Sequence, residues 1–265
     1  MEDILRAAKK VAIQAALQAG QEAKNRFENI NSILEKDDFG DVVTEVDHLA
    51  EEIILTHIAK SFPDHCVDSE EIGHNGRQSD WMWIVDPLDG TNNYAIGLPL
   101  FATSITLMYQ GNPVLAVIYE PMVDRLFVSA ADKGAYCNNI RVQTKPCPSI
   151  QRGTIGWIQG HKVQNEARAV KLRHHLDVRF KRMMRVWAPT LQWCMLAKGD
   201  LDGIVLYNSE GTDLYSGILM VQEAGGLVMD YEGKPFSGMS PEPYLIACHP
   251  AHKEHFLKTV AEGMG

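Results

Sequence analysis

Two aspartates stand three residues apart at the end of a hydrophobic segment, in the sequence Trp83-Ile84-Val85-Asp86-Pro87-Leu88-Asp89-Gly90-Thr91-Asn92-Asn93. The bulky and β-branched residues before Asp86 predict a buried strand, and the Pro and Gly residues predict a turn at its end. Carboxylates this close repel each other, and the repulsion grows as water is excluded. A divalent cation removes this repulsion, and oxygen donors favour Mg²⁺ or Mn²⁺. The backbone N–H groups of Gly90 and Thr91 would suit a phosphate oxygen, although Asp, Pro and Gly also form ordinary surface turns.

Three further carboxylates could join this pair, and each also has a purely structural explanation. Asp47 stands at the third position of a predicted helix whose N-cap is Thr44, so it is also a candidate capping carboxylate. Glu70 follows a short predicted strand, where paired acids are ordinarily solvated. Asp213 begins an apolar helix, where the helix dipole favours a negative charge.

The elements that would position these acids form an α/β chain in two tightly joined parts. Alanine-rich periodicity predicts a helix over residues 2–29, and hairpin signals between residues 101 and 137 predict an antiparallel sheet. Strands and helices alternate after Pro148. We therefore predict an N-terminal α+β half over residues 1–145, with most of the acids, and a C-terminal α/β half over residues 146–265, with Asp213.

Composition narrows the function classes. The 265 residues are 45% hydrophobic, which is enough for a large core, and the net charge of −9 disfavours a nucleic-acid surface. The cysteines are scattered and odd in number, which suggests reduced thiols in a cytoplasmic protein, and no signal peptide is visible. Residues 90–119 carry no charge, but turn signals divide this segment into strands, so we expect no membrane span.

The acidic segments occur in an order and spacing that resemble the inositol monophosphatase family. The segments are Asp41-Val42-Val43-Thr44-Glu45-Val46-Asp47, Ser69-Glu70-Glu71, Trp83 to Thr91, and Asp213 followed by Glu223-Ala224-Gly225-Gly226. The resemblance covers nearly the whole chain, and the Asp-Pro-Leu-Asp-Gly-Thr segment is highly specific. It implies an α-β-α-β-α sandwich of the sugar phosphatase type. It also implies a Mg²⁺-dependent, lithium-sensitive phosphatase related to fructose-1,6-bisphosphatase, acting as a cytoplasmic homodimer.

The resemblance also implies a ligand set. Glu70, Asp86 and the backbone carbonyl of Leu88 would bind a first Mg²⁺ ion, and Asp86, Asp89 and Asp213 would bind a second. A weaker third ion would lie beside Glu70, and Mn²⁺ could substitute for Mg²⁺. Thr91, hydrogen-bonded to Asp47, would orient the attacking water together with Glu70.

The remaining contacts implied by the resemblance concern the substrate. Gly90, Thr91 and Asn92 would bind the phosphate, Arg185 and Asp213 would contact the substrate, and Lys36 would lie in a mobile loop over the site. Two metal ions would activate water for in-line attack on a phosphate monoester, without a covalent intermediate. The substrate would be an inositol, a sugar or a related alcohol phosphate. The alternatives are histidinol phosphate, fructose bisphosphate, a nucleotide 3′-phosphate, or a non-catalytic regulatory dimer.

The sequence departs from the family pattern around the substrate alcohol. Thr212 replaces the usual Trp before Asp213, and Leu206 replaces a hydroxyl-binding Glu of inositol-specific relatives. The segment Arg185-Val186-Trp187-Ala188-Pro189-Thr190-Leu191 is bulkier and more apolar than its counterpart. We therefore expect an apolar wall here, and myo-inositol 1-phosphate is not expected to be the best substrate.

Two other enzyme classes fit less well. Haloacid-dehalogenase-type phosphatases need one residue between their two aspartates, whereas two residues separate Asp86 and Asp89. A metal hydrolase based on histidine would need paired ligands, but His252 and His255 have no acid signature nearby.

Overall fold

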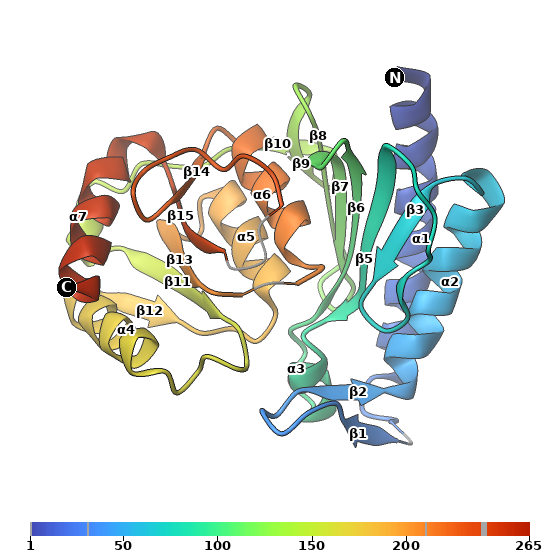
Figure 1. Cartoon of the computed structure of the whole chain (residues 1–265), viewed down its shortest axis with the longest axis horizontal. Helices are drawn as coiled ribbons and strands as arrows, with labels where there is room; N and C mark the ends of the chain where they lie inside the picture. The colour runs from blue at the N-terminus through green and yellow to red at the C-terminus, as the bar shows by residue number, and fades with distance from the viewer. Residues whose placement is uncertain (1, 31, 210, 240–242) are drawn as a thin grey trace.

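The computed structural model describes residues 2–30, 32–209, 211–239 and 243–265. These residues form five layers, in the order helices, sheet, helices, sheet, helices (Figure 1). The predicted α-β-α-β-α sandwich is therefore confirmed.

The first sheet carries the Asp86-to-Asp89 segment. Its eight strands lie in the order β10-β9-β8-β7-β6-β5-β3-β4. Strand β5, in the interior of the sheet, runs parallel to β3 and antiparallel to β6. The strands span β3 (Cys66–Ser69), β4 (Gly73–His74), β5 (Trp81–Asp89), β6 (Ala102–Tyr109), β7 (Asn112–Glu120), β8 (Arg125–Ala130), β9 (Gly134–Cys137) and β10 (Ile140–Val142).

Two helices, α1 (Glu2–Arg26) and α2 (Glu45–Ser61), cover the outer face of this sheet. The buried face of α1 consists almost entirely of alanine, and small side chains let a helix approach its neighbours closely. Thr44 caps α2 in a complete capping box, as predicted. The hairpin of β1 (Ile33–Glu35) and β2 (Val42–Thr44) precedes α2 and was not predicted.

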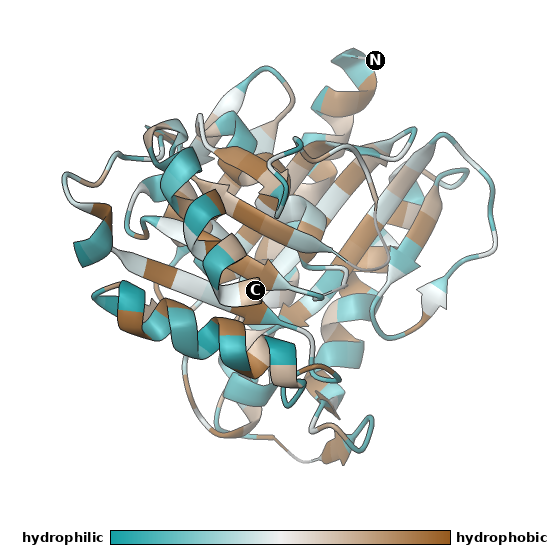
Figure 2. Ribbon diagram, turned by 60° about the vertical axis from the view of Figure 1, so that its left-hand side comes forward, coloured by the Kyte–Doolittle hydropathy of each residue, from teal (hydrophilic) through white to brown (hydrophobic). Residues whose placement is uncertain are grey.

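The second sheet has five strands in the order β12-β11-β13-β15-β14. The strands span β11 (Thr154–Gln159), β12 (Arg182–Met184), β13 (Gly203–Tyr207), β14 (Leu227–Asp230) and β15 (Tyr244–Cys248). Helices α4 (Ala167–Arg179) and α7 (Lys253–Met264) cover its outer face. Figure 2, with these helices in front, shows hydrophilic and hydrophobic residues mixed along them and mainly hydrophobic strands behind.

The middle layer consists of α5 (Pro189–Lys198) and α6 (Leu214–Glu223), which pack against strands of both sheets. Most of their residues are buried, because helices between two sheets have no free face. The short elements are α3 (Thr91–Ala95) and the 3₁₀ turns η1 (Ile150–Arg152) and η2 (Pro250–His252). Within the described residues, every helix is too short or too polar to span a bilayer.

Most elements agree with the sequence prediction, but β11 was missed. Its sequence, Thr-Ile-Gly-Trp-Ile-Gln, is bounded by Gly153 and Gly160, which is a recognisable strand signal. The division of the chain near residue 145 stays a prediction. It coincides with the segment that joins the two sheets.

Candidate active site

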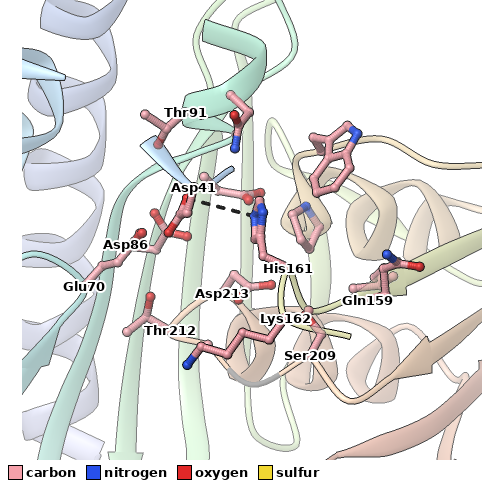
Figure 3. Close-up of a pocket in the computed structure, with 18 of the residues that line it drawn as sticks. Asp41, Glu70, Asp86, Thr91, Gln159, His161, Lys162, Ser209, Thr212 and Asp213 are labelled. Atoms are coloured by element: carbon pink, nitrogen blue, oxygen red, sulfur yellow. Dashed lines mark ion pairs between the residues drawn. The ribbon is translucent and has the colours of Figure 1, made fainter. Parts of the chain in front are cut away.

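A cavity of about 550 Å³ brings together residues from both sheets and from the middle helices. Most of the predicted site residues line it, and they are Glu70, Asp86, Leu88, Asp89, Gly90, Thr91, Asn92, Arg185 and Asp213. Figure 3 shows Glu70, Asp86 and Thr91 on one side and Gln159 and His161 on the other. Asp47 and Lys36 lie behind the lining and contact it through hydrogen bonds.

An irregularity in β5 positions the two central aspartates. Asp86 pairs with Ser104 and Asp89 with Ala102, and the register with β6 shifts between these two pairs. The Leu88 N–H donates to Asp86 Oδ1 at 3.1 Å. The predicted turn is therefore a bulge inside a strand, and both carboxylates are held by the regular pairing on either side.

The electrostatics of the cavity are strongly unfavourable for negative charge. Burial, with the charges of Glu70, Asp89 and Asp213, raises the pKa of Asp86 well above its ordinary value. Burial and the charge of Asp213 do the same to the pKa of Asp89. Burial, followed by the charge of Glu70, raises the pKa of Asp213 to about 7. Without a cation, these carboxyl groups therefore retain protons at pH values where free aspartate is ionised.

Asp89 connects the two sheets through α5. Its Oδ2 accepts hydrogen bonds from the Thr190 N–H, at 2.8 Å, and from the Thr190 hydroxyl.

Gly90, which follows Asp89, has a φ of 100°, and a Cβ there would lie 2.8 Å from the Leu100 carbonyl oxygen and 3.0 Å from Ala188 Cβ. Only glycine fits this position without strain.

Asp47 combines the two roles that its sequence position suggested. Its Oδ2 accepts hydrogen bonds from the Thr44 N–H at 2.8 Å and from the Thr44 hydroxyl at 2.6 Å, which completes the helix cap. Its Oδ1 lies 2.7 Å from the Thr91 hydroxyl, which is 2.9 Å from the Leu88 carbonyl oxygen. One buried carboxylate therefore caps α2 and holds a hydroxyl at the cavity wall.

Glu70 is held by neighbouring charges. Lys36 Nζ donates to Glu70 Oε1 at 2.8 Å and to Glu71 Oε1 at 2.6 Å. Burial acts to lower the pKa of Lys36, but these two glutamates raise it overall. Sequence reasoning missed Glu51, whose buried carboxylate accepts hydrogen bonds from Ser69 and from the backbone just after Glu70.

The donor set suits a hard divalent cation, although the carboxylates are not gathered around one point. Asp86, Asp89, Asp213 and Glu70 offer only oxygen, and the raised pKa values of the three aspartates show that they repel one another and Glu70. Across the described ranges, no group of three His, Cys, Asp or Glu side chains could hold a metal ion in its present position. The residues therefore fit Mg²⁺ chemically, and binding would draw their side chains together.

The opposite wall includes polar and basic side chains that the sequence did not reveal. Gln159, His161 and Lys162 come from the end of β11 and the loop after it, and all three line the cavity. His161 Nε2 lies 3.9 Å from Asp41 Oδ1. The Trp187 ring lies 5.0 Å from the His161 ring, and the Arg185 guanidinium lies over it at 5.6 Å. A prediction of strand β11 from the sequence would have put Gln159 at the end of a strand, where site residues commonly lie.

The expected apolar wall faces the cavity only in part: Trp187 and Pro189 line it, whereas Leu206 and Leu191 do not. Leu206 is fully buried on β13 and does not line the cavity, because its side chain belongs to the hydrophobic core of the middle layer. Leu191 is buried in the same core. At the end of β13, Asn208 and Ser209 reach the cavity instead. Counting seven residues back from Asp213 therefore gives a core position that does not line the cavity.

Comparison with known proteins agrees with the fold and the cavity. Residues 5–264 match the model of the inositol monophosphatase family. A fructose-1,6-bisphosphatase/inositol-1-monophosphatase of Aquifex aeolicus is 36% identical over 262 residues, which are 96% of each chain. The Nus factor SuhB of Vibrio cholerae is 33% identical over 226 residues, covering 84% of this chain and 85% of that protein. The crystal structure of the extragenic suppressor protein SuhB from Bartonella henselae superposes with a TM-score of 0.89 at 30% identity, covering 97% of this chain and 99% of that chain.

These findings define the class as a phosphatase of the superfamily that includes inositol monophosphatase and fructose-1,6-bisphosphatase. The chain belongs to the inositol monophosphatase family. Enzymes of this family are generally metal-dependent and act on small-molecule phosphates.

Proposed function

We propose that this protein is a Mg²⁺-dependent phosphate monoester hydrolase acting on an inositol, sugar or related alcohol phosphate. The observation that carries the proposal is the convergence of Asp86, Asp89 and Asp213 on one cavity, where burial and mutual repulsion raise their pKa values. Such a cluster is unfavourable in a folded protein unless cations compensate it.

The metal ligands would follow the arrangement implied by the resemblance to the family. Glu70, Asp86 and the Leu88 carbonyl would hold one ion, Asp86, Asp89 and Asp213 would hold a second, and a weaker third would lie beside Glu70. Mn²⁺ would be an effective substitute, because it accepts the same oxygen donors. When bound, the ions would lower the pKa of a water molecule and neutralise charge on the leaving oxygen.

The protein's own groups would position the reactants. Because the Thr91 hydroxyl can donate to Asp47, its lone pairs would accept a proton of the attacking water, which Glu70 would hold from the other side. The Gly90 and Thr91 N–H groups and the Asn92 side chain would bind phosphate oxygens. Arg185 would contact the alcohol portion. No nucleophilic side chain is needed, so inversion at phosphorus is expected.

Phosphate release from 4-nitrophenyl phosphate and myo-inositol 1-phosphate tests the proposal. We expect turnover with Mg²⁺, none in excess chelator, and inhibition by Ca²⁺, because Ca²⁺ takes more ligands at longer distances. Millimolar lithium is expected to inhibit. Full turnover in chelator would refute the metal-dependent reaction, whereas a flat lithium titration would argue only against the lithium-sensitive branch.

A second candidate role is regulatory, because relatives that cover most of this chain are named Nus factor SuhB. In that case the fold would bind a partner protein in the cytoplasm as a homodimer. Sedimentation analysis would test the dimer. A chain that binds Mg²⁺ but hydrolyses no phosphate ester in a broad panel would favour the regulatory role over catalysis.

A further inference from the structure

Thr190 holds the Asp89 carboxylate with two donors. Thr190 is fully buried, and its N–H and its hydroxyl both donate to the same oxygen, Asp89 Oδ2. Within the described ranges, Asp89 Oδ1 accepts no hydrogen bond and is not enclosed by protein atoms, and Asp89 lines the cavity. The carboxylate is therefore attached to α5 through one oxygen, and the other oxygen is available to a cation.

The start of α5 brings these donors to Asp89. The N-cap residue, Ala188, has no side chain that could cap the helix, and Pro189 follows at the first helical position. The Thr190 N–H has no acceptor within its own helix, and Asp89 supplies one from the first sheet. The helix dipole also favours a carboxylate at this end of a helix. The close packing of Gly90 against Ala188 keeps the two segments together.

The hydroxyl adds a constraint that the backbone bond alone does not provide. The terminal torsion of an aspartate side chain is soft, so one hydrogen bond to Oδ2 leaves the carboxylate partly free to turn. A second donor on the same oxygen restricts this motion. The donor is itself well fixed, because a buried, β-branched threonine has little rotational freedom. A ligand that is already oriented binds a cation with a smaller loss of conformational entropy.

We propose that Thr190 is a positioning residue for the second metal ion, which Asp86, Asp89 and Asp213 would bind. Its hydroxyl would hold Asp89 with Oδ1 available to that ion, and Thr190 itself would touch neither the ion nor the substrate. The inference rests on the proposed phosphatase function. Among the described residues Thr190 donates to Asp89 and not to Glu70, so binding of the first ion should depend much less on it.

Substitutions of two buried threonines test the hydroxyl. Thr190→Val has nearly the same shape and keeps the N–H bond but removes the hydroxyl, whereas Thr190→Ser keeps both donors. Thr106→Val is the matched control, because Thr106 is equally buried, on β6, and its hydroxyl has no hydrogen-bond partner among the described residues. Thr190→Ala removes the same hydroxyl without placing a methyl group against Asp89, so it provides the comparison if the Val variant does not fold.

Isothermal titration of the metal-free protein with Mg²⁺ measures binding directly. We expect Thr190→Val to weaken the binding of one ion by about tenfold or more, the usual effect of removing a group that orients a metal ligand. Thr190→Ser and Thr106→Val should bind Mg²⁺ like the wild type. With 4-nitrophenyl phosphate, Thr190→Val should need about tenfold more Mg²⁺ for half of its maximal rate, and saturating Mg²⁺ should restore most of kcat. A general loss of structure would not be reversed in this way.

Each outcome bears on a stated conclusion. Wild-type Mg²⁺ affinity in a folded Thr190→Val or Thr190→Ala variant overturns the positioning role and leaves the phosphatase in place. Equal losses of affinity in Thr190→Val and Thr106→Val also overturn it, and so does a Thr190→Ser variant that binds as weakly as Thr190→Val. A wild-type protein that neither binds Mg²⁺ nor releases phosphate overturns the proposed function itself, and this inference with it.

Discussion

Glu70 differs from the other acids of the cavity in being partly exposed and held by Lys36. Its side chain is 30% exposed, whereas Asp86 and Asp89 are almost completely buried. A carboxylate that is accessible to water and oriented by a neighbour is suited to accept a proton from an attacking water. The buried aspartates, by contrast, are suited to hold cations.

Replacing Glu70 with Gln is therefore expected to lower kcat by at least about a hundredfold, the usual contribution of a general base. Glu71→Gln is the matched control, because Glu71 makes the same kind of contact with Lys36 but does not line the cavity. Initial rates of phosphate release at saturating Mg²⁺ measure both variants. If both variants lose the same amount of activity, the shared contact with Lys36 explains the loss. If both keep the wild-type rate, Glu70 is not the general base.

The acids of the site could be predicted from sequence because each belongs to a short local motif. Asp86 and Asp89 share one strand, and Asp47 is fixed by its helix cap. Thr190 and Gln159 could not be found in this way. Thr190 reaches Asp89 across 101 positions of sequence, and the orientation of Gln159 depends on Arg173 in a neighbouring helix. Tertiary contacts of this kind leave no local pattern.

Among the secondary-structure elements, the connection between β5 and α3 is the most constrained. Gly90 has a left-handed backbone conformation, and its Cα faces the Leu100 carbonyl and Ala188. Gly97, at the other end of α3, has a φ of 77° and nothing within 4 Å of the position a Cβ would take. The two glycines therefore share the backbone strain and differ in the space around them.

This difference predicts the effects of two alanine variants. Gly97→Ala should lower the free energy of unfolding by about 1 kcal/mol, the strain of a left-handed alanine. Gly90→Ala should lower it by about 1–3 kcal/mol more, because the new methyl group overlaps neighbouring atoms. Urea denaturation of both variants provides the measurement. If they lose the same stability, the close packing around Gly90 is not a constraint.

Element boundaries were predicted well where periodicity was clear. The sequence predicts strands over residues 102–109, 227–230 and 244–248, and β6, β14 and β15 begin and end at these residues, because turn formers follow each hydrophobic segment. Strand β5 was predicted to stop before its aspartates, because Asp and Pro are turn formers. The structure continues the pairing through a bulge, since β6 supplies partners on both sides. Propensity was overridden by a neighbouring strand.

The cavity carboxylates also affect the stability of the whole molecule. The pKa of Asp213 is raised to about 7, and those of Asp86 and Asp89 are raised well above ordinary values, against about 4 in an unfolded chain. Between these values the folded state binds more protons than the unfolded state. The contribution of Asp213 to stability is therefore fully present at about pH 4 and below and is lost as the pH rises through about 7, and the contribution of Asp86 and Asp89 falls as the pH rises above about 4.

The metal-free protein is accordingly expected to lose stability through these groups as the pH rises from about 4 to 7, and saturating Mg²⁺ should reduce the loss by balancing the ionised carboxylates. Thermal unfolding at several pH values, with chelator or with Mg²⁺, tests this. Asp213→Asn should flatten the metal-free profile. If the metal-free wild type and Asp213→Asn show the same dependence of stability on pH, the Asp213 carboxyl group makes no such contribution.

The bond from Thr190 to Asp89 has a consequence for protein synthesis. When the residues of the first sheet have been synthesised, the nascent chain contains Glu70, Asp86 and Asp89. Thr190 and Asp213 have not yet been added. A nascent chain of this length has the acids of the cavity and lacks the helices that hold and complete them. In a synchronised translation reaction, hydrolysis should therefore begin only after α6 has been made. Turnover by chains arrested before Thr190 would show that the first half suffices.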